Sequence, residues 1–343
     1  MSELKESPKP KLSAGLLDYA QKTYSIKLTK KPKVLWGSRS LNLLLNTVDG
    51  RFVLRVHRDW ITSGRLQAIQ TAHKALNAAD IPSADLKPTL TGETWTKYKN
   101  NLVELESYVE NDGDMNTWER LEAGLPMLGR IHSIFKTLEV NSEGKHPVVA
   151  NHIAPEDVQK LTKRAEARIN QWGPDTKQLE FVAIVKGLAC RLETAESQYV
   201  GKLPHQLVHG DFWDNNVLFR NEKLVVVLDL DFMGERARID DLALTLYYTN
   251  SMLGGDYLSD ERIRKLSRLA ELYDSGQDEP LTATERAALP LAIARTPLFM
   301  MRYIAMMESK KEAAKPMAND LVDYKWGLGL LDDLKHWQET FAK

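Results

Sequence analysis

Cysteine, net charge and long apolar runs are all scarce in this chain of 343 residues. Its single cysteine, Cys190, excludes a disulfide framework within the chain and favours a reducing, cytoplasmic location. Cys190 lies in an apolar-periodic segment, which predicts a small core residue rather than a nucleophile. A net charge of −1 gives no sign of a nucleic-acid or anionic membrane partner. With a charged N-terminus and no run of about eighteen apolar residues, neither a transmembrane helix nor a secretory signal is expected.

Strand patterns dominate the first third of the sequence. Asp49-Gly50 is a hairpin signal between two apolar stretches, and Leu66, Ile69 and Leu76 recur at helical spacing. These patterns predict a five-stranded antiparallel sheet with one helix, residues 63–79, inserted after the third strand. The expected strands lie near residues 33–36, 41–46, 51–58, 93–98 and 102–109.

Helical periodicity dominates from Asn111 onward. The expected helices cover residues 115–138, 155–172, 177–200, 241–253, 259–273, 282–309 and 321–341. We therefore predict an α+β protein with two lobes. Residues 1–110 form a small strand-rich lobe, and residues 111–343 form a larger, mainly helical lobe.

The most informative stretch is LVHGDFWDNNVLF at residues 207–219, which contains the pattern H-x-D-x-x-x-x-N. A second apolar run follows and ends in Asp229. Phosphoryl transfer needs a carboxylate base for the attacking hydroxyl and oxygen ligands that hold Mg²⁺ on the phosphates of ATP. The pattern predicts Asp211 as the base, Asn216 and Asp229 as metal ligands, and His209 as a structural residue of the loop. The alternative is a polar turn between two core strands, but a turn does not require an acid at the end of the second apolar run.

This stretch, together with VLDLDF and the later Asp240-Asp241-Leu242-Ala243, resembles the aminoglycoside phosphotransferase and choline kinase superfamily, which includes a homoserine kinase type. The resemblance covers roughly residues 30–340. It implies a bilobal protein-kinase-like fold and an ATP- and Mg²⁺-dependent kinase acting on a hydroxyl group of a small molecule. It also implies that Asp241 braces the catalytic loop. The sequence lacks the H-R-D, D-F-G and A-P-E motifs of the eukaryotic protein kinases.

The resemblance also assigns residues to the nucleotide. Arg55 occupies the third-strand position where the superfamily places a lysine or arginine for the α- and β-phosphates. The usual partner is a glutamate in the following helix, where this chain offers only Gln67 and Gln70. The turn that covers the phosphates would contain Ser38 and Ser40, and backbone groups around Glu106 and Tyr108, where the lobes join, would contact the adenine.

Candidates for the acceptor side are Trp213, Asp214, Asp231 and Arg302. Trp213 fits a core aromatic equally well, and Asp231 fits a metal-assisting or solvated carboxylate. The surplus of carboxylates in Asp214, Asp231 and Glu235 favours an acceptor with an amine, such as an amino sugar, an amino alcohol or homoserine, since a desolvated ammonium needs acidic partners. Arg236 and Arg238 lie close in sequence and could cancel part of this charge.

Two competing functions remain at this point. The missing helix glutamate would suit a catalytically inactive nucleotide-binding scaffold, although the intact aspartates and asparagine of the motif argue against it. A kinase of proteins is disfavoured because no activation segment separates Asp229 from the helix at Asp241.

Overall fold

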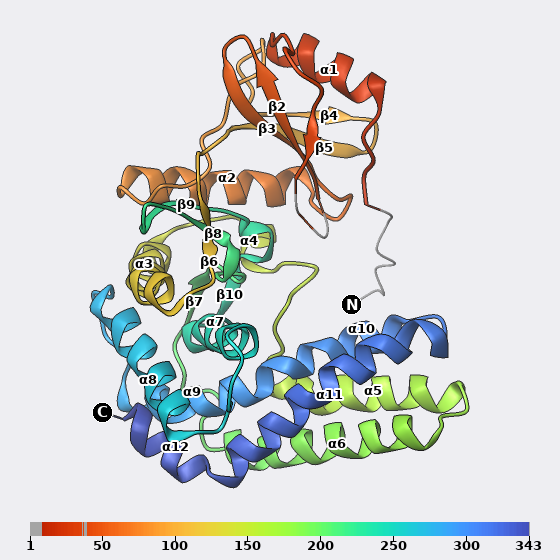
Figure 1. The fold of residues 1–343 in the computed structure, drawn as a ribbon, viewed down its shortest axis with the longest axis vertical. Coiled ribbons are helices and arrows are strands. Elements are labelled where there is room, and N and C mark those ends of the chain that lie inside the picture. Colours follow the sequence, from red (N-terminus) through yellow and green to blue (C-terminus); the bar gives the residue numbers. More distant parts are fainter. Residues whose placement is uncertain (1–8, 36, 38–39, 343) are drawn as a thin grey trace.

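The structure is a computed structural model that describes residues 9–35, 37 and 40–342 (Figure 1). The strands are β1 (Lys33–Val34), β2 (Leu41–Thr47), β3 (Gly50–Val56), β4 (Trp95–Tyr98), β5 (Asn101–Ser107), β6 (Gly113–Met115), β7 (His205–Val208), β8 (Asp214–Arg220), β9 (Lys223–Val227) and β10 (Gly234–Ala237). The main helices are α1 (Ala14–Tyr24), α2 (Ser63–Ala78), α3 (Trp118–Thr137), α4 (Ser142–Lys145), α5 (Val158–Gln171), α6 (Thr176–Glu196), α7 (Arg238–Met252), α8 (Asp260–Ser275), α9 (Ala283–Arg295), α10 (Met300–Met306), α11 (Lys310–Asp332) and α12 (Leu334–Phe341).

The N-terminal strands form one antiparallel sheet in the order β1-β2-β3-β5-β4, with α2 following β3, which confirms the sequence prediction. Side chains alternate across the sheet because successive residues of a strand point to opposite faces. Leu43, Leu54 and Leu105 on one face form a separate small core with α1. Neighbouring positions of the same strands carry Arg55 and Glu104, so the face toward α2 is polar. Figure 1 shows α2 lying between this sheet and the rest of the molecule, and its apolar side chains belong to the larger core.

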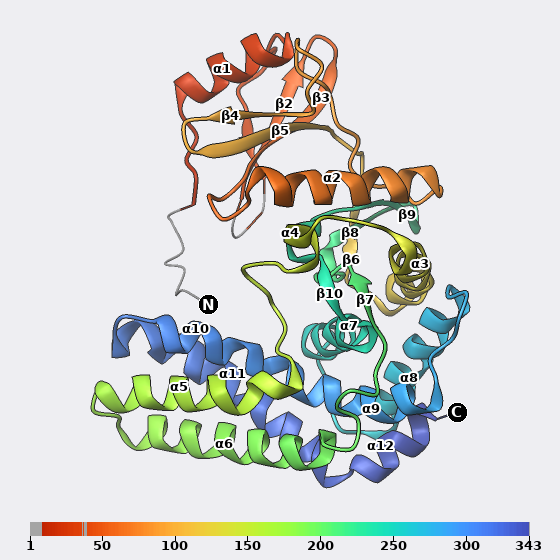
Figure 2. The same cartoon turned by 180° about the vertical axis from the view of Figure 1, so that it is seen from behind.

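The helical part surrounds a small group of strands below α2 (Figures 1 and 2). There β7 pairs with β10, and β8 pairs with both β6 and β9. Helix α7 lies centrally, while α6 and α12 lie at the end farthest from the five-stranded sheet (Figure 2). Among the described residues, no helix combines the length and the apolar character that crossing a bilayer would require.

Two predictions about the last helices are wrong. Residues 282–309 do not form one helix, because α9 ends at Arg295 and a 3₁₀ turn, Thr296–Phe299, precedes α10. Pro297 lacks the N–H that a continuous helix needs and restricts the residue before it. The helix expected from residue 321 instead begins at Lys310, where the Ser309 side chain accepts a hydrogen bond from Glu312 N.

Cys190 also differs from the prediction, since it is exposed. On helix α6, the buried residues that pack in the core include Val185, Leu188, Ala189 and Leu192. These residues define one face of the helix, and Cys190 lies outside it because each residue advances the helix by about 100°.

A buried ion triad joins α9 to α6 and α7. Arg295 is only 3% exposed, its Nη1 lies 2.6 Å from Glu196 Oε1, and its second terminal nitrogen contacts Asp240. Burial raises the pKa of Glu196 to about 7. The charge of Arg295 opposes this effect and favours the ionised form of the Glu196 carboxylate.

Replacing Arg295 by methionine is expected to lower the free energy of unfolding by about 3–5 kcal/mol, because two buried carboxylates lose their counter-charge. Without Arg295, which lowers it, the pKa of Glu196 in the folded state would rise further above its unfolded value, so the loss should shrink as the pH falls through this raised pKa. Urea unfolding at several pH values measures both effects. The matched control is Arg191→Met, which removes an exposed pair with Asp332 and should cost less than about 1 kcal/mol. Equal losses for the two variants would contradict the importance of the triad.

Candidate active site

The Asp211 carboxylate is fixed from both sides. Asn216 Nδ2 donates to Asp211 Oδ2 at 2.8 Å, and Asn151 Nδ2 donates to Asp211 Oδ1 at 2.5 Å. Asn151 belongs to the segment between α4 and α5, and no motif in the sequence identified it. Burial, followed by the charge of Asp229, raises the pKa of Asp211, which strengthens it as a proton acceptor.

Asp241 holds the loop that carries Asp211, as the family resemblance implied. Its Oδ1 accepts from Gly210 N at 2.9 Å, and its Oδ2 lies 2.9 Å from His132 Nε2 on α3. Gly210 has φ +84°, and a Cβ there would lie 2.2 Å from the carbonyl oxygen of Phe232. The loop can therefore pass this close to the chain only with glycine at this position.

His209 is fully buried beside the loop. Its Nδ1 accepts from Asp211 N at 3.2 Å, and its ring meets Phe212 edge-on at a centroid distance of 5.6 Å. Burial lowers the pKa of His209, which favours the neutral ring. These contacts suit the structural role predicted for this residue.

The β8–β9 hairpin brings Asn216 and Asp229 together. Leu228 N donates to Asn216 O at 2.8 Å, and Asp229 follows directly in a left-handed conformation with φ +61°. The amide hydrogens of Asn216 point to Asp211, so its carbonyl oxygen is left as a ligand atom. Within the described residues there is no cluster of three or more His, Cys, Asp or Glu suited to a metal. One amide and one carboxylate nevertheless fit Mg²⁺, which keeps several water molecules and takes its other ligands from phosphates.

Arg55 reaches this group from the polar face of the sheet. Its Nη2 lies 2.8 Å from Asp229 Oδ1 and 2.9 Å from Asp231 Oδ2. Burial by itself would lower the pKa of Arg55, but the two aspartates raise it well above its usual value. Gln70 of α2 donates from its Nε2 to Glu104 Oε2 at 2.8 Å.

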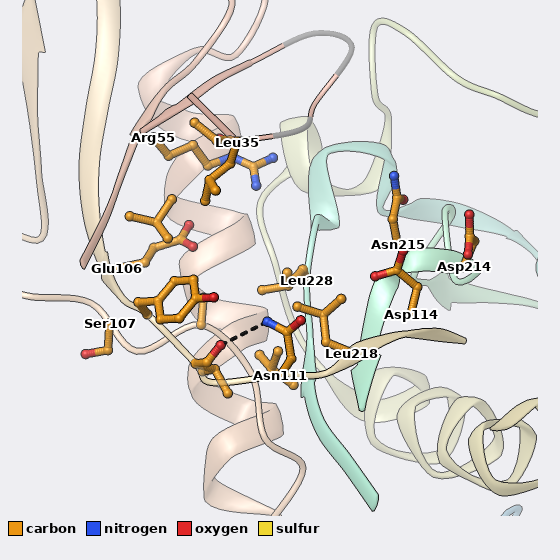
Figure 3. A pocket seen from close by; sticks show the side chains of 16 residues that line it. Leu35, Arg55, Glu106, Ser107, Asn111, Asp114, Asp214, Asn215, Leu218 and Leu228 are labelled. Atoms are coloured by element: carbon orange, nitrogen blue, oxygen red, sulfur yellow. Dashed lines mark hydrogen bonds between the residues drawn. The ribbon is translucent and has the colours of Figure 1, made fainter. Parts of the chain in front are cut away.

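A cavity of about 500 Å³ opens beside Arg55, between the sheet and the β8–β9 hairpin (Figure 3). Arg55, Glu106 and Tyr108 all line it, as predicted for the nucleotide. Burial and the charge of Glu104 raise the pKa of Glu106 to about 7. The apolar lining consists of Leu35, Val53, Ala84, Val109, Leu218, Val226 and Leu228, which suits a flat aromatic ring.

The two predicted serines are placed differently. Ser40 is 5% exposed and lies outside the lining of the cavity, with its Oγ 3.5 Å from Asp231 Oδ2. Ser38 lies outside the described residues.

The four acceptor candidates do not come together. Trp213 stacks on Tyr248 of α7 with ring centroids 4.2 Å apart. Asp214 instead lines the cavity near Asp114 (Figure 3), and Asp231 is 3% exposed and faces Arg55, which excludes a solvated carboxylate. Arg302 Nη1 donates to Ala150 O at 3.1 Å, next to the residue that holds Asp211.

The sequence did not reveal the acids near Trp213. Burial raises the pKa of the Tyr248 phenol most, and the charges of Asp211 and then of Asp320 and Asp323 on α11 raise it further, so these acids lie near Tyr248. Tyr247 donates to Asp323 Oδ2 at 2.9 Å, whereas Asp320 Oδ2 is buried without a hydrogen-bond partner. The apolar periodicity of α11 gave no hint of this, since both acids lie more than 100 positions beyond the motif.

Comparison with known proteins supports the resemblance. Residues 116–277 match the sequence model of the phosphotransferase enzyme family. A homoserine kinase of Parvibaculum lavamentivorans is 30% identical over 146 residues, which is 41% of this chain and 43% of that protein. The aligned part thus spans less than half of this relative.

Solved structures match over most of the chain. A microcompartment-associated aminopropanol kinase has a TM-score of 0.69 at 16% identity, covering 96% of this chain and 99% of that one. An amicoumacin kinase in complex with AMP-PNP and Ca²⁺ has a TM-score of 0.66 at 14% identity, covering 90% and 92%. These similarities confirm the kinase-like fold. The family match covers the catalytic loop and the hairpin, so this part of the chain is similar in sequence to the phosphotransferase enzyme family.

Proposed function

We propose that this protein is an ATP- and Mg²⁺-dependent kinase that phosphorylates a hydroxyl group of a small, amine-bearing molecule in the cytoplasm. Residues 1–110 form the nucleotide-binding lobe, and residues 111–343 carry the catalytic loop and the acceptor site. The observation that carries the proposal is the arrangement of Asp211, Asn216 and Asp229 around one hairpin, beside a cavity that Arg55 enters.

Each residue has a distinct task in this proposal. The purine would lie in the 500 Å³ cavity against its apolar lining, and Arg55 would bind the α- and β-phosphates. Asn216 Oδ1 and the Asp229 carboxylate would hold Mg²⁺, which neutralises charge on the phosphates. Asp211 would orient the acceptor hydroxyl and take its proton as the new O–P bond forms and the bond to ADP breaks.

Three observations favour an amine on the acceptor. Asp320 has a buried oxygen without a partner, and burial and Asp323 raise its pKa to about 6. An ammonium group would relieve this cost of burial. Trp213 and Tyr248 add a stacked aromatic pair on which a cation can rest. The acids of α11 thus replace Asp214 and Asp231 as the basis for the amine preference.

The proposal also agrees with what the relatives are named for. The aminopropanol kinase and the homoserine kinase are named for acceptors that contain both an amine and a hydroxyl group.

An ADP-release assay with ATP and Mg²⁺ tests the function over a panel of amino alcohols, amino sugars, homoserine, choline and neutral sugars. We expect acceptor-dependent ADP release with at least one amine-bearing compound. Turnover only with neutral sugars would contradict the amine preference but not the kinase. Nucleotide binding without turnover of any acceptor would instead favour an inactive scaffold.

Asp320→Asn is expected to raise the KM for the amine acceptor by about tenfold, since a charged partner is worth about 1.5 kcal/mol. The KM for ATP should stay within about twofold because Asp320 does not line the cavity. The matched control is Asp332→Asn on the same helix, whose carboxylate is exposed and pairs with Arg191. A change in the KM for ATP instead of the KM for the acceptor would place Asp320 elsewhere.

A further inference from the structure

The chain contains a phosphate-facing arginine but no acid in the helix that follows it. Helix α2 has neither aspartate nor glutamate, and its Gln70 bonds Glu104. A guanidinium that is 8% exposed still needs a counter-charge and a fixed orientation. We infer that Asp231 is the positioning residue of Arg55 and holds its guanidinium toward the nucleotide cavity.

The two aspartates that contact Arg55 differ in how exposed their side chains are, which indicates different roles. The Asp229 side chain is 31% exposed and the Asp231 side chain 5%, although both lie within 2.9 Å of the same Arg55 nitrogen. A metal needs a carboxylate that water and phosphate can reach, which Asp229 provides. When Asp229 takes up the metal, Arg55 retains Asp231 as its directly bonded carboxylate.

Asp231 is itself fixed by its surroundings. Its backbone oxygen accepts from Arg65 Nη2 at 2.9 Å, and its Oδ1 lies 3.9 Å from His57 Nδ1. Ser40 Oγ lies 3.5 Å from Oδ2, the same oxygen that contacts Arg55. Helix α2 therefore still participates, but it supplies a cation, Arg65, that holds the backbone of Asp231 instead of supplying the anion itself.

Glu104 is also close to Arg55, but it does not take over the role of Asp231 as the bonded carboxylate. It lies directly opposite Arg55 in the β3–β5 pair, yet its two oxygens are taken by His57 Nε2 and Gln70 Nε2, each at 2.8 Å. Its charge acts on Arg55 at longer range. Asp231 does not line the cavity, so it acts through Arg55 and not on the nucleotide.

This inference rests on the proposed role of Arg55 in nucleotide binding. Its test measures the affinity for ADP by calorimetry, with and without Mg²⁺, and the KM for ATP and kcat. For Asp231→Asn we expect ADP binding about tenfold weaker in both conditions and a KM for ATP raised to match, with a smaller change in kcat. Asp231→Glu retains the charge and should recover part of the affinity. Glu222→Gln, which removes an exposed acid at the turn of the β8–β9 hairpin, should match the parent.

A double-mutant cycle with Arg55→Gln gives the decisive comparison. If Asp231 acts through Arg55, Asp231→Asn should change ADP affinity by less than about twofold in the Arg55→Gln background. Full additivity would overturn the inference while leaving the kinase proposal in place. If Asp231→Asn does not fold, Asp231→Glu serves in the same cycle, and a loss of affinity in the Arg55→Gln background as large as its loss in the parent background would overturn the inference. A parent protein that binds no nucleotide would overturn the proposed function as well.

Discussion

Asp211→Asn is expected to lower kcat by about a thousandfold, because an amide cannot accept the proton of the acceptor hydroxyl. The variant should fold normally. Its carbonyl oxygen can keep the bond from Asn216, and its new amide group would face Asn151. Asn151 Oδ1 is buried without a hydrogen-bond partner. A flip of the Asn151 side-chain amide would turn this oxygen toward the new amide group, which would then donate to it. The substitution therefore removes the base without opening a gap in the loop.

Nucleotide binding distinguishes this account from a general loss of structure. Calorimetry with ADP and Mg²⁺ should give an affinity within about twofold of the parent, since Asp211 acts on the acceptor. A folded Asp211→Asn protein that no longer binds ADP would assign Asp211 to the nucleotide. Retention of more than about a tenth of the parent kcat would contradict its role as the base.

Asp229→Ala is expected to abolish the Mg²⁺-dependent part of nucleotide binding and to lower turnover by about a thousandfold. Metal stabilisation of the transferring phosphoryl group is worth several kcal/mol, and each 1.4 kcal/mol is about tenfold in rate. Metal-free binding of ADP should survive, because Arg55 keeps Asp231 at 2.9 Å.

The measurement is a titration of ADP affinity against Mg²⁺ concentration for the parent and the variant. The parent curve should rise with Mg²⁺, and the curve of the variant should stay flat. Glu222→Ala, which removes an exposed acid at the turn of the same hairpin, should follow the parent. If Asp229→Ala kept turnover within a few-fold of the parent, the metal ligands would have to lie elsewhere.

Local patterns made the core of the site predictable. Asp211, Asn216 and Asp229 lie within one hairpin, so their spacing in sequence nearly determines their spacing in space. The same holds for the strand pairs of the five-stranded sheet, which short turns connect. Arg55 could be assigned from the family resemblance, because the third strand that carries it was predictable from its local pattern.

The partners of these residues could not be predicted, because they come from distant segments. Asn151 reaches Asp211 from 60 positions away, and Asp231 reaches Arg55 from 176 positions away. The acceptor side depends on how α11 packs against α7, which brings Asp320 near Tyr248. Helical periodicity shows which face of a helix is apolar but not which neighbour its polar face meets.

The most direct test of the account is mass spectrometry of the acceptor after incubation with ATP, Mg²⁺ and either the parent or Asp211→Asn. We expect an amine-bearing acceptor to gain one phosphoryl group with the parent and to stay unmodified with the variant over the same time. A phosphorylated acceptor formed equally by both proteins would contradict the catalytic assignment. If none of the amino alcohols, amino sugars, homoserine, choline or neutral sugars became phosphorylated although the parent binds ATP, the kinase proposal itself would be contradicted.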